Sequence, residues 1–320
     1  MHTPTLALSI TMLAATLLAV QAVPVRASFD PDMAAFELQV DGKPINYRQF
    51  FLTTMPGSTL EIRAGQSTGS EHWARSSGGT LVPAGPGRWM WTAPDEPGRF
   101  ELNVENGRDS IEVQLLVMRA LTEVTDGYLN GYRIGKYPRK PLNNKPIYLP
   151  PKGLIEVHPD MIDLPLSPHF TLGQFLCKQQ PDHWPKYLAL REPLLIKLEL
   201  ILEEINRRGI ATDSLFVMSG YRTPWYNRSL GNGQYSRHIW GGAADIFIDT
   251  NGDGRMDDLT GDGKVDVNDA DLLRSIIEEK FGKPRNRPLR GGLGLYGPRP
   301  HRGPFVHVDV RGEDARWEFP

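Results

Sequence analysis

Apolar and polar residues alternate in short runs between residues 34 and 118, and this period is that of β-strands with one buried face. The runs cover residues 36–40, 59–63, 88–92, 100–104 and 110–114. Turn-forming pairs such as Asp41-Gly42 and Pro97-Gly98 separate them. Strands of this length and spacing predict an antiparallel β-sandwich over residues 34–118.

The second half of the chain has helical periodicity as well as strands. Apolar residues recur at helical spacing from Leu190 to Arg208, with Pro193 suited to the first turn and Gly209 to the stop. A second helix is predicted over residues 269–281, and strands over 214–218 and 305–310. Because these elements lack a βαβ rhythm, residues 166–320 are predicted to form an α+β domain.

A proline-rich basic segment, residues 119–165, separates the two predicted domains. No acidic residue occurs from Gly127 to Ile155. The cations of this stretch are Arg133, Lys136, Arg139, Lys140, Lys145 and Lys152. The composition predicts a solvated linker, and the alternative is a basic surface that faces an anionic polymer such as the cell wall.

The N-terminal residues have the pattern of an export signal. Residues 6–20 are uncharged and largely apolar, and small residues follow at Ala22 and Ala27. We predict a cleaved signal peptide over residues 1–27, with an uncleaved anchor as the alternative. Either reading predicts an exported protein, periplasmic or secreted.

Composition removes several classes of function. The 320 residues contain 36 Lys and Arg against 38 Asp and Glu, a formal net charge of −2, which argues against a nucleic-acid partner. The lone Cys177 excludes an intramolecular disulfide framework and a thiolate zinc cluster. A metal site must therefore be built from His, Asp and Glu.

Three separated segments together carry such a donor set. Ser236-Arg237-His238 precedes Asp245 by a short glycine- and alanine-rich turn, and His307 lies on the predicted last strand. Two imidazoles and one carboxylate, with a position left for water, make up a catalytic zinc arrangement.

The pattern SGYR…SRHxxGxAxD…HVD resembles the M15 family of zinc D-alanyl-D-alanine peptidases, which includes VanX-type dipeptidases and phage endolysin peptidases. Hedgehog signalling domains share the same metal scaffold. The resemblance covers roughly residues 166–319. It implies Zn²⁺ bound by His238, Asp245 and His307, with Arg222 facing the scissile carbonyl and Ser236 in the wall of the site. It also implies hydrolysis of D-Ala-containing bonds in peptidoglycan stem peptides, by a D,D-carboxypeptidase or an endopeptidase.

One position departs from the family pattern. Many members place an acidic general base three residues before the last histidine, where this chain has Pro304. Asp309 shares a strand face with His307, so we expect Asp309 to be the base. His301 is the second candidate, and a site without such a base is the third.

Residues 249–269 contain two consecutive calcium-type loops. The first opens with D-x-N-x-D-G and the second resembles dockerin and EF-hand loops, although it has Asp269 where those have Glu. The expected Ca²⁺ ligands are Asp249, Asn251, Asp253, Asp257, Asp258, Thr260, Asp262, Asp266 and Asp269. We predict structural calcium, and the alternative is a flexible acidic loop.

Three functions are compatible with these features. The first is an exported zinc metallopeptidase that acts on peptidoglycan stem peptides. The second is a zinc-containing, non-catalytic module that binds the cell wall or a protein, which the missing upstream acid favours. The third is a calcium-dependent adhesin that makes its cell-wall or protein contact through the β-domain, whose segment Trp91-Thr92-Ala93-Pro94 resembles bacterial immunoglobulin-like modules.

Overall fold

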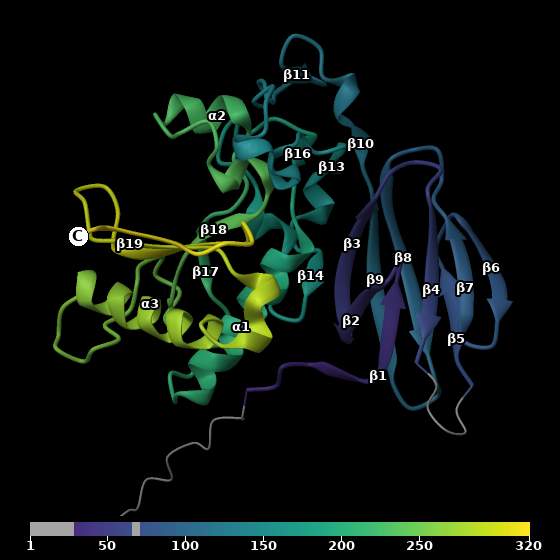
Figure 1. The fold of residues 1–320 in the computed structure, drawn as a ribbon, viewed down its shortest axis with the longest axis horizontal. Helices are drawn as coiled ribbons and strands as arrows, with labels where there is room; N and C mark the ends of the chain where they lie inside the picture. The colour runs from purple at the N-terminus through teal and green to yellow at the C-terminus, as the bar shows by residue number, and fades with distance from the viewer. Residues whose placement is uncertain (1–28, 66–70) are drawn as a thin grey trace, which may run out of the picture.

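The computed structural model describes residues 29–65 and 71–320 (Figure 1). The predicted signal peptide, residues 1–27, lies outside this part of the chain. Two β-sheets occupy the N-terminal third, and a mixed α+β unit lies beside them (Figure 1). None of the helices in the described residues combines the length and the apolar character that crossing a membrane requires.

The N-terminal sheets lie in two layers, whose buried apolar side chains belong to one core. The first sheet has the order β2 (Lys43–Tyr47), β1 (Met33–Val40), β4 (Thr59–Ala64), β7 (Arg88–Thr92), β6 (Thr80–Gly85). The second has the order β3 (Gln49–Thr54), β9 (Ser110–Val117), β8 (Gly98–Glu105), β5 (Trp73–Ser76). The five alternating runs of the sequence all lie in strands, and β2, β3, β5 and β6 were not predicted.

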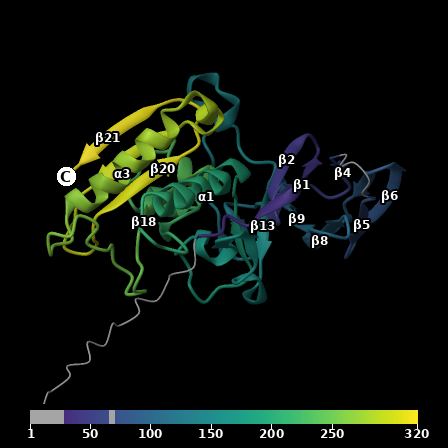
Figure 2. The same cartoon turned by 90° about the horizontal axis from the view of Figure 1, so that it is seen from below.

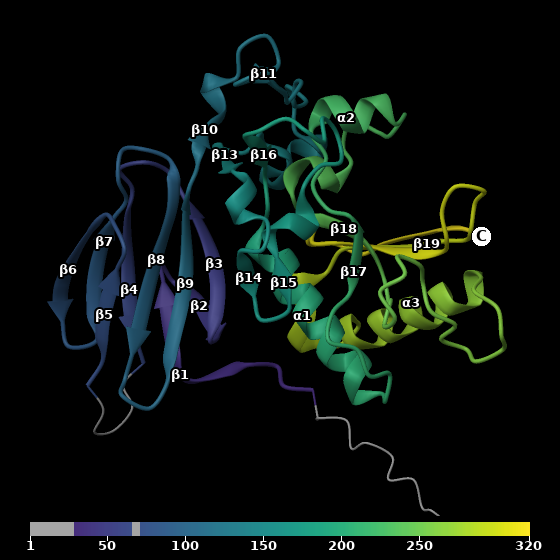
Figure 3. The same cartoon turned by 180° about the vertical axis from the view of Figure 1, so that it is seen from behind.

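The expectation of a wholly antiparallel sandwich is wrong for one pair, because β3 runs parallel to β9. The apolar residues Phe50, Phe51 and Leu52 follow one another in β3 and are all buried. A continuous apolar run is typical of a strand covered on both faces, and β3 contacts β14 (Pro165–Ser167) of the neighbouring unit (Figure 3). The immunoglobulin-like assignment of the sandwich stays a prediction.

Residues 119–165 are folded against the α+β unit, so the solvated-linker prediction is wrong. In this segment β13 (Gly153–Val157) pairs with both β10 (Arg119–Ala120) and β16 (Lys186–Leu188). The apolar side chains of Leu154, Ile155 and Val157 are buried and belong to the hydrophobic core, which a solvated linker would not contribute to. The short pairs are β11 (Tyr128–Leu129) with β12 (Tyr132–Arg133), and β14 with β15 (Phe170–Thr171). The 3-10 helices outside the site are η1 (Leu121–Glu123), η2 (Leu142–Asn144), η3 (Pro146–Tyr148), η4 (Pro159–Met161), η5 (Leu172–Phe175) and η7 (Pro284–Leu289).

A five-stranded sheet forms the centre of the C-terminal unit. Its order is β17 (Phe216–Ser219), β18 (Ala243–Phe247), β20 (Phe305–Asp309), β19 (Gly292–Tyr296), β21 (Ala315–Phe319). The helices α1 (Glu192–Arg207) and α3 (Val267–Phe281) lie along one side of this sheet, while α2 (Pro224–Ser229) lies on the other (Figures 1 and 2). The α+β prediction is confirmed, and α1 has Pro193 in its first turn and Gly209 at φ 89° after its end.

Candidate metal centre

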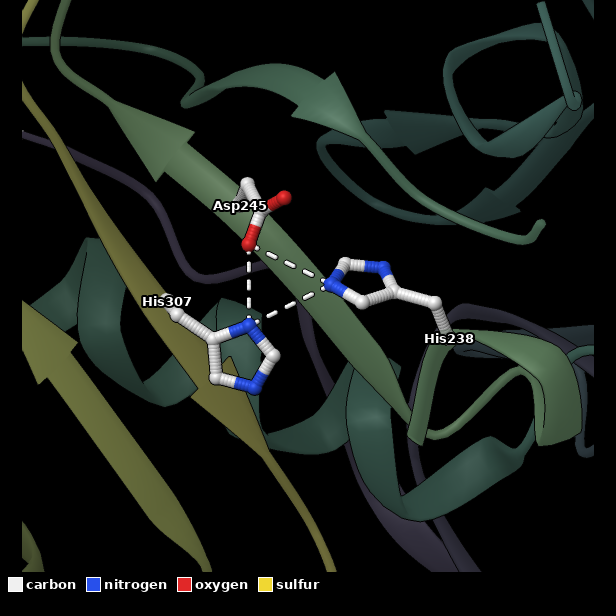
Figure 4. Close-up of side chains that lie close together, drawn as sticks. All are labelled: His238, Asp245 and His307. Carbon is white, nitrogen blue, oxygen red and sulfur yellow. Dashed lines mark hydrogen bonds and ion pairs between the residues drawn. The ribbon is translucent and has the colours of Figure 1, made fainter. Parts of the chain in front are cut away.

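Strand register brings Asp245 and His307 together. In the antiparallel β18–β20 pair these two residues are direct partners, and Asp245 also pairs with Ser219 of β17. Directly paired residues point to the same face of a sheet. As a result, Asp245 Oδ1 lies 2.9 Å from His307 Nδ1 (Figure 4).

His238 reaches the same point from η6 (Arg237–Trp240), a short helix that ends in a left-handed turn at Gly241. Gly241 has φ 62°, and a Cβ there would lie 2.0 Å from the Ala189 carbonyl oxygen, so the turn requires glycine. His238 Nε2 lies 3.3 Å from Asp245 Oδ1 and 3.2 Å from His307 Nδ1 (Figure 4). His238 and Asp245 therefore converge across the tight turn at Gly241, as the sequence predicted.

Hydrogen bonds on the far edge of each imidazole set its orientation. His238 Nδ1 lies 2.6 Å from the carbonyl oxygen of Gly220, and His307 Nε2 lies 3.2 Å from Asp309 Oδ2. Both partners are hydrogen-bond acceptors, so these contacts favour the tautomers that carry the proton on the far nitrogens and turn the lone pairs of His238 Nε2 and His307 Nδ1 toward Asp245. Two imidazole nitrogens and one carboxylate oxygen arranged in this way fit Zn²⁺. Within residues 29–65 and 71–320, no other set of three His, Cys, Asp or Glu side chains converges in this way.

Asp245 is charged despite its burial. Burial alone would raise its carboxyl pKa, but His238, His307 and Arg222 beside it outweigh that effect and hold the pKa well below its usual range. The Arg222 guanidinium contacts Asp245 Oδ2, and its Nε donates to Ser219 Oγ at 2.8 Å. Arg222 is thereby fixed beside the metal centre.

A cavity of about 670 Å³ opens over the three donors. Arg222 and Ser236 line it, as the family resemblance implied. Sequence reasoning missed Trp317 of β21, which also lines it and whose Nε1 donates to Tyr296 Oη at 2.9 Å. A Cβ at Gly294 would lie 2.3 Å from Trp317 Nε1. A glycine inside a strand often marks a place where another group packs closely against the backbone. Gly292 and Gly294 were therefore the sequence signal that a bulky side chain, here Trp317, covers this strand.

Asp309 lies behind His307 and not in the cavity wall, so its prediction as general base is wrong. It is fully buried, and its carboxylate accepts hydrogen bonds from His307 Nε2, the Gly292 N–H (2.8 Å) and the Arg311 side chain. Burial raises its pKa, but His307 and Arg311 outweigh that effect and lower it far. The shared strand face was predicted correctly, but at that spacing the carboxylate meets the outer edge of the imidazole. His301 is exposed and does not line the cavity.

A family model matches the part of the chain that holds two of the three donors. Residues 169–259 match the family model described as Peptidase M15, and the matched stretch holds Arg222, His238 and Asp245. The chain contains an M15 family peptidase domain. No curated protein matches the chain. One solved structure, of the Yersinia pseudotuberculosis adhesin InvE, is similar at 15% identity over 28% of this chain and 28% of that chain, with a TM-score of 0.18.

The acidic insertion of the M15 domain has a loop structure of its own. Asp249 accepts hydrogen bonds from the N–H groups of Gly252 and Gly254, both at 2.8 Å. Asp258 accepts in the same way from Gly261 and Gly263, both at 2.7 Å, and these bonds lower its pKa.

Asp269, the expected twelfth ligand of the second calcium loop, is buried, and its carboxylate binds backbone N–H groups. Its carboxylate accepts from the N–H groups of Leu259 (2.8 Å), Thr260 (3.0 Å) and Asp266 (2.8 Å), and so joins the loop to the start of α3. The structural calcium site stays a prediction.

Proposed function

We propose that the chain is an exported zinc metallopeptidase that hydrolyses D-Ala-containing peptide bonds of peptidoglycan stem peptides. The observation that carries the proposal is the convergence of His238 Nε2, Asp245 Oδ1 and His307 Nδ1 at one side of a cavity in an M15 domain. Export rests on the predicted signal peptide over residues 1–27.

The side chains of the site have separate roles in this reaction. Zn²⁺ bound by the three donors would supply Lewis acidity and an activated water. Arg222 is fixed by Ser219 and Asp245 and faces the same cavity, so its guanidinium stabilises negative charge that develops on the scissile carbonyl oxygen. Asp309 keeps the His307 ring in the orientation that presents Nδ1 to the metal position.

The surroundings of the cavity support an anionic cell-wall partner. Lys136, Arg139 and Lys140 are exposed, and the Tyr235 hydroxyl, which belongs to the cavity wall, donates to the Lys140 carbonyl oxygen at 3.1 Å. The basic segment therefore runs beside the cavity, and its charges attract carboxylate- and phosphate-bearing polymers. We assign a cell-wall or protein contact to the β-domain as a separate part of this proposal.

One observation favours the second candidate, a zinc-containing binding module without turnover. Asp245 is the sole Asp or Glu among the described residues that line the cavity, and it is a metal donor. A wall without a free carboxylate lacks the most common proton acceptor of a zinc peptidase.

The two functions are separated by incubating the purified chain and Zn²⁺ with muropeptides and weighing the products. Loss of one D-Ala identifies a carboxypeptidase, and cleavage of cross-linked dimers identifies an endopeptidase. Unchanged muropeptides that still bind the protein would establish the binding module. Asp245→Asn is the inactive control, and the exposed His301→Ala is the matched control that should behave as the unmodified chain.

A further inference from the structure

The cavity beside the metal centre is strongly cationic. Arg222, Arg237, Arg302 and Arg311 all line it, against the single carboxylate of Asp245. Two of these guanidinium groups are paired, Arg222 with Asp245 and Arg311 with Asp309. Such a balance favours a ligand that brings negative charge of its own.

Arg237 is not available to that ligand. Its side chain is buried, and its guanidinium lies over the rings of Tyr148 and Trp240, 4.7 and 5.2 Å from their centroids. Its Nη1 donates to the Ile147 carbonyl oxygen at 3.0 Å. Arg237 thus packs the base of η6, and its charge acts on the cavity only at a distance.

Arg302 differs from Arg222 and Arg311 because it is held in place without an ion pair, and from the buried Arg237 because it is partly exposed. Its Nη1 donates to the carbonyl oxygens of Gly297 (2.8 Å) and Gly303 (3.3 Å), and its guanidinium lies 4.7 Å from the Phe305 ring centroid. In the described part of the chain it forms no ion pair, and its Nε and Nη2 have no acceptor. A half-buried, held guanidinium with free parallel donors is the group that proteins use to bind carboxylates.

The position of Arg302 suits one particular carboxylate of a peptide. Phe305, over which the guanidinium lies, precedes His307 by two residues on the same face of β20, a separation of about 7 Å along the strand. An extended peptide advances about 3.3–3.6 Å per residue. A terminal carboxylate lies one residue, about 3.3–3.6 Å, beyond the carbonyl group of the last peptide bond, and a hydrogen bond of about 2.9 Å to a guanidinium covers most of the remaining distance to Arg302. Arg302, Asp245 and His307 line the same cavity.

We propose that Arg302 binds the free C-terminal carboxylate of the substrate peptide and so selects the terminal bond for hydrolysis. This inference rests on the proposed peptidase function and gives it a direction, toward a carboxypeptidase. An acidic side chain of the stem peptide offers the same chemical group, and the experiment separates these two sources.

The test measures binding by calorimetry with the zinc-loaded chain. The probes are a D-Ala-D-Ala stem peptide with its scissile amide replaced by a ketomethylene group, the same peptide with a C-terminal amide, and a third form whose acidic side chain is neutralised. The unmodified chain should bind the amide form roughly 10- to 100-fold more weakly than the free acid, the range for a hydrogen bond to a charged group. Arg302→Gln should weaken the free acid by that factor and leave the amide form unchanged, while Arg302→Lys should restore part of the preference.

Two controls keep the result specific. Arg299→Gln removes an exposed cation of the same loop that does not line the cavity, and it should bind as the unmodified chain does. Zinc content and melting temperature should be equal in all variants, which excludes loss of the fold.

Each outcome decides one of the two proposals. Equal binding of acid and amide forms by the unmodified chain, or loss of affinity only for the side-chain-neutral form, overturns the assignment of Arg302. Acid-selective binding that depends on Arg302, together with no hydrolysis of the cleavable peptide, overturns the peptidase function and leaves the carboxylate site. Failure to bind any of the three forms overturns both.

Discussion

His307 Nε2 and Asp309 Oδ2 lie 3.2 Å apart, on the edge of the imidazole that faces away from Asp245 and His238. The His307 ring therefore contacts the buried Asp309 carboxylate through Nε2 and the metal donor Asp245 through Nδ1. Arg311 holds the carboxylate from its other side. A side chain in this position controls the direction of a metal ligand and has no access to the substrate.

Asp309→Asn should therefore weaken metal binding. The amide cannot accept the Nε2 proton and the Arg311 donors as a carboxylate does, so Nδ1 loses its fixed orientation. Loss of such a supporting partner typically lowers metal affinity about 10- to 100-fold, measurable by competition with a zinc chelator. Asp314→Asn, at a partly exposed side chain that pairs with Arg316, is the control. Unchanged zinc affinity with a lower rate in Asp309→Asn would restore the general-base interpretation.

Removal of any one metal donor should abolish stoichiometric zinc. His238→Ala, Asp245→Ala and His307→Ala each leave two donors, which cannot hold the ion in competition with water and buffer. Plasma emission analysis of purified proteins should find about one zinc in the unmodified chain and in His301→Ala, and little in the three variants. Full zinc in all three would remove the basis of the peptidase proposal.

Gly241→Ala should both destabilise the fold and displace His238, because Gly241 forms the turn that ends η6. The left-handed conformation at φ 62° alone costs about 1–2 kcal/mol for a non-glycine residue, and the contact with the Ala189 carbonyl oxygen adds to that. Gly231→Ala isolates the conformational part, because Gly231 has φ 74° and nothing lies within 4 Å of its Cβ position. In urea unfolding we expect a loss of about 3 kcal/mol or more for Gly241→Ala. Equal losses in the two variants would contradict the steric argument.

The His169–Glu199 pair should make stability depend on pH. His169 Nδ1 lies 2.7 Å from Glu199 Oε2; burial lowers the His169 pKa, but Glu199, Asp32 and Asp213 outweigh it and raise the pKa above the ordinary value. A raised pKa gives a contribution that is complete below about pH 6.5 and is lost as pH rises through the folded-state pKa.

His169→Ala should therefore reduce the unfolding free energy by about 1–3 kcal/mol at pH 6, and by less at pH 9. Urea unfolding with zinc held constant measures both values. His158→Ala, at an exposed histidine beside Glu156, should change little at either pH. Equal losses at pH 6 and pH 9 would show that His169 acts through packing alone.

Calcium should stabilise the chain if the predicted loops bind it. Ca²⁺ at one hundred times its dissociation constant would add about 2.7 kcal/mol to the unfolding free energy. Scanning calorimetry with and without Ca²⁺, at constant zinc, measures the effect. Asp258→Asn should abolish it and Asp271→Asn, on α3 outside the loops, should not. An unchanged melting temperature would leave only the flexible acidic loop.

Local sequence patterns predicted the helices and strands of this fold better than they predicted the tertiary contacts between them. Helix α1 followed from the apolar spacing between Pro193 and Gly209, and the three metal donors from their motif spacing. The parallel position of β3 depends on contact with β14, which no local pattern of residues 49–54 contains.

The same limit applies within the site. Strand alternation placed Asp309 on the face of His307 but could not say which edge of the ring it would meet. Arg302 and Trp317 gave no motif at all, since their roles arise from rings and backbone atoms that meet only in the folded chain.

The position of β21 has a consequence for when the site comes into existence. His307 and Trp317 are contributed by the last two strands of the sheet, and β21 is held through its parallel pairing with β19. A nascent chain that had reached only the end of β19 would carry His238 and Asp245 but neither the third donor nor the tryptophan wall. Because synthesis proceeds from the N-terminus, the β-sandwich, the basic segment and most of the sheet precede the reactive centre. The proposed hydrolytic capacity would then be acquired only once β20 and β21 are present, after the β-sandwich and the basic segment.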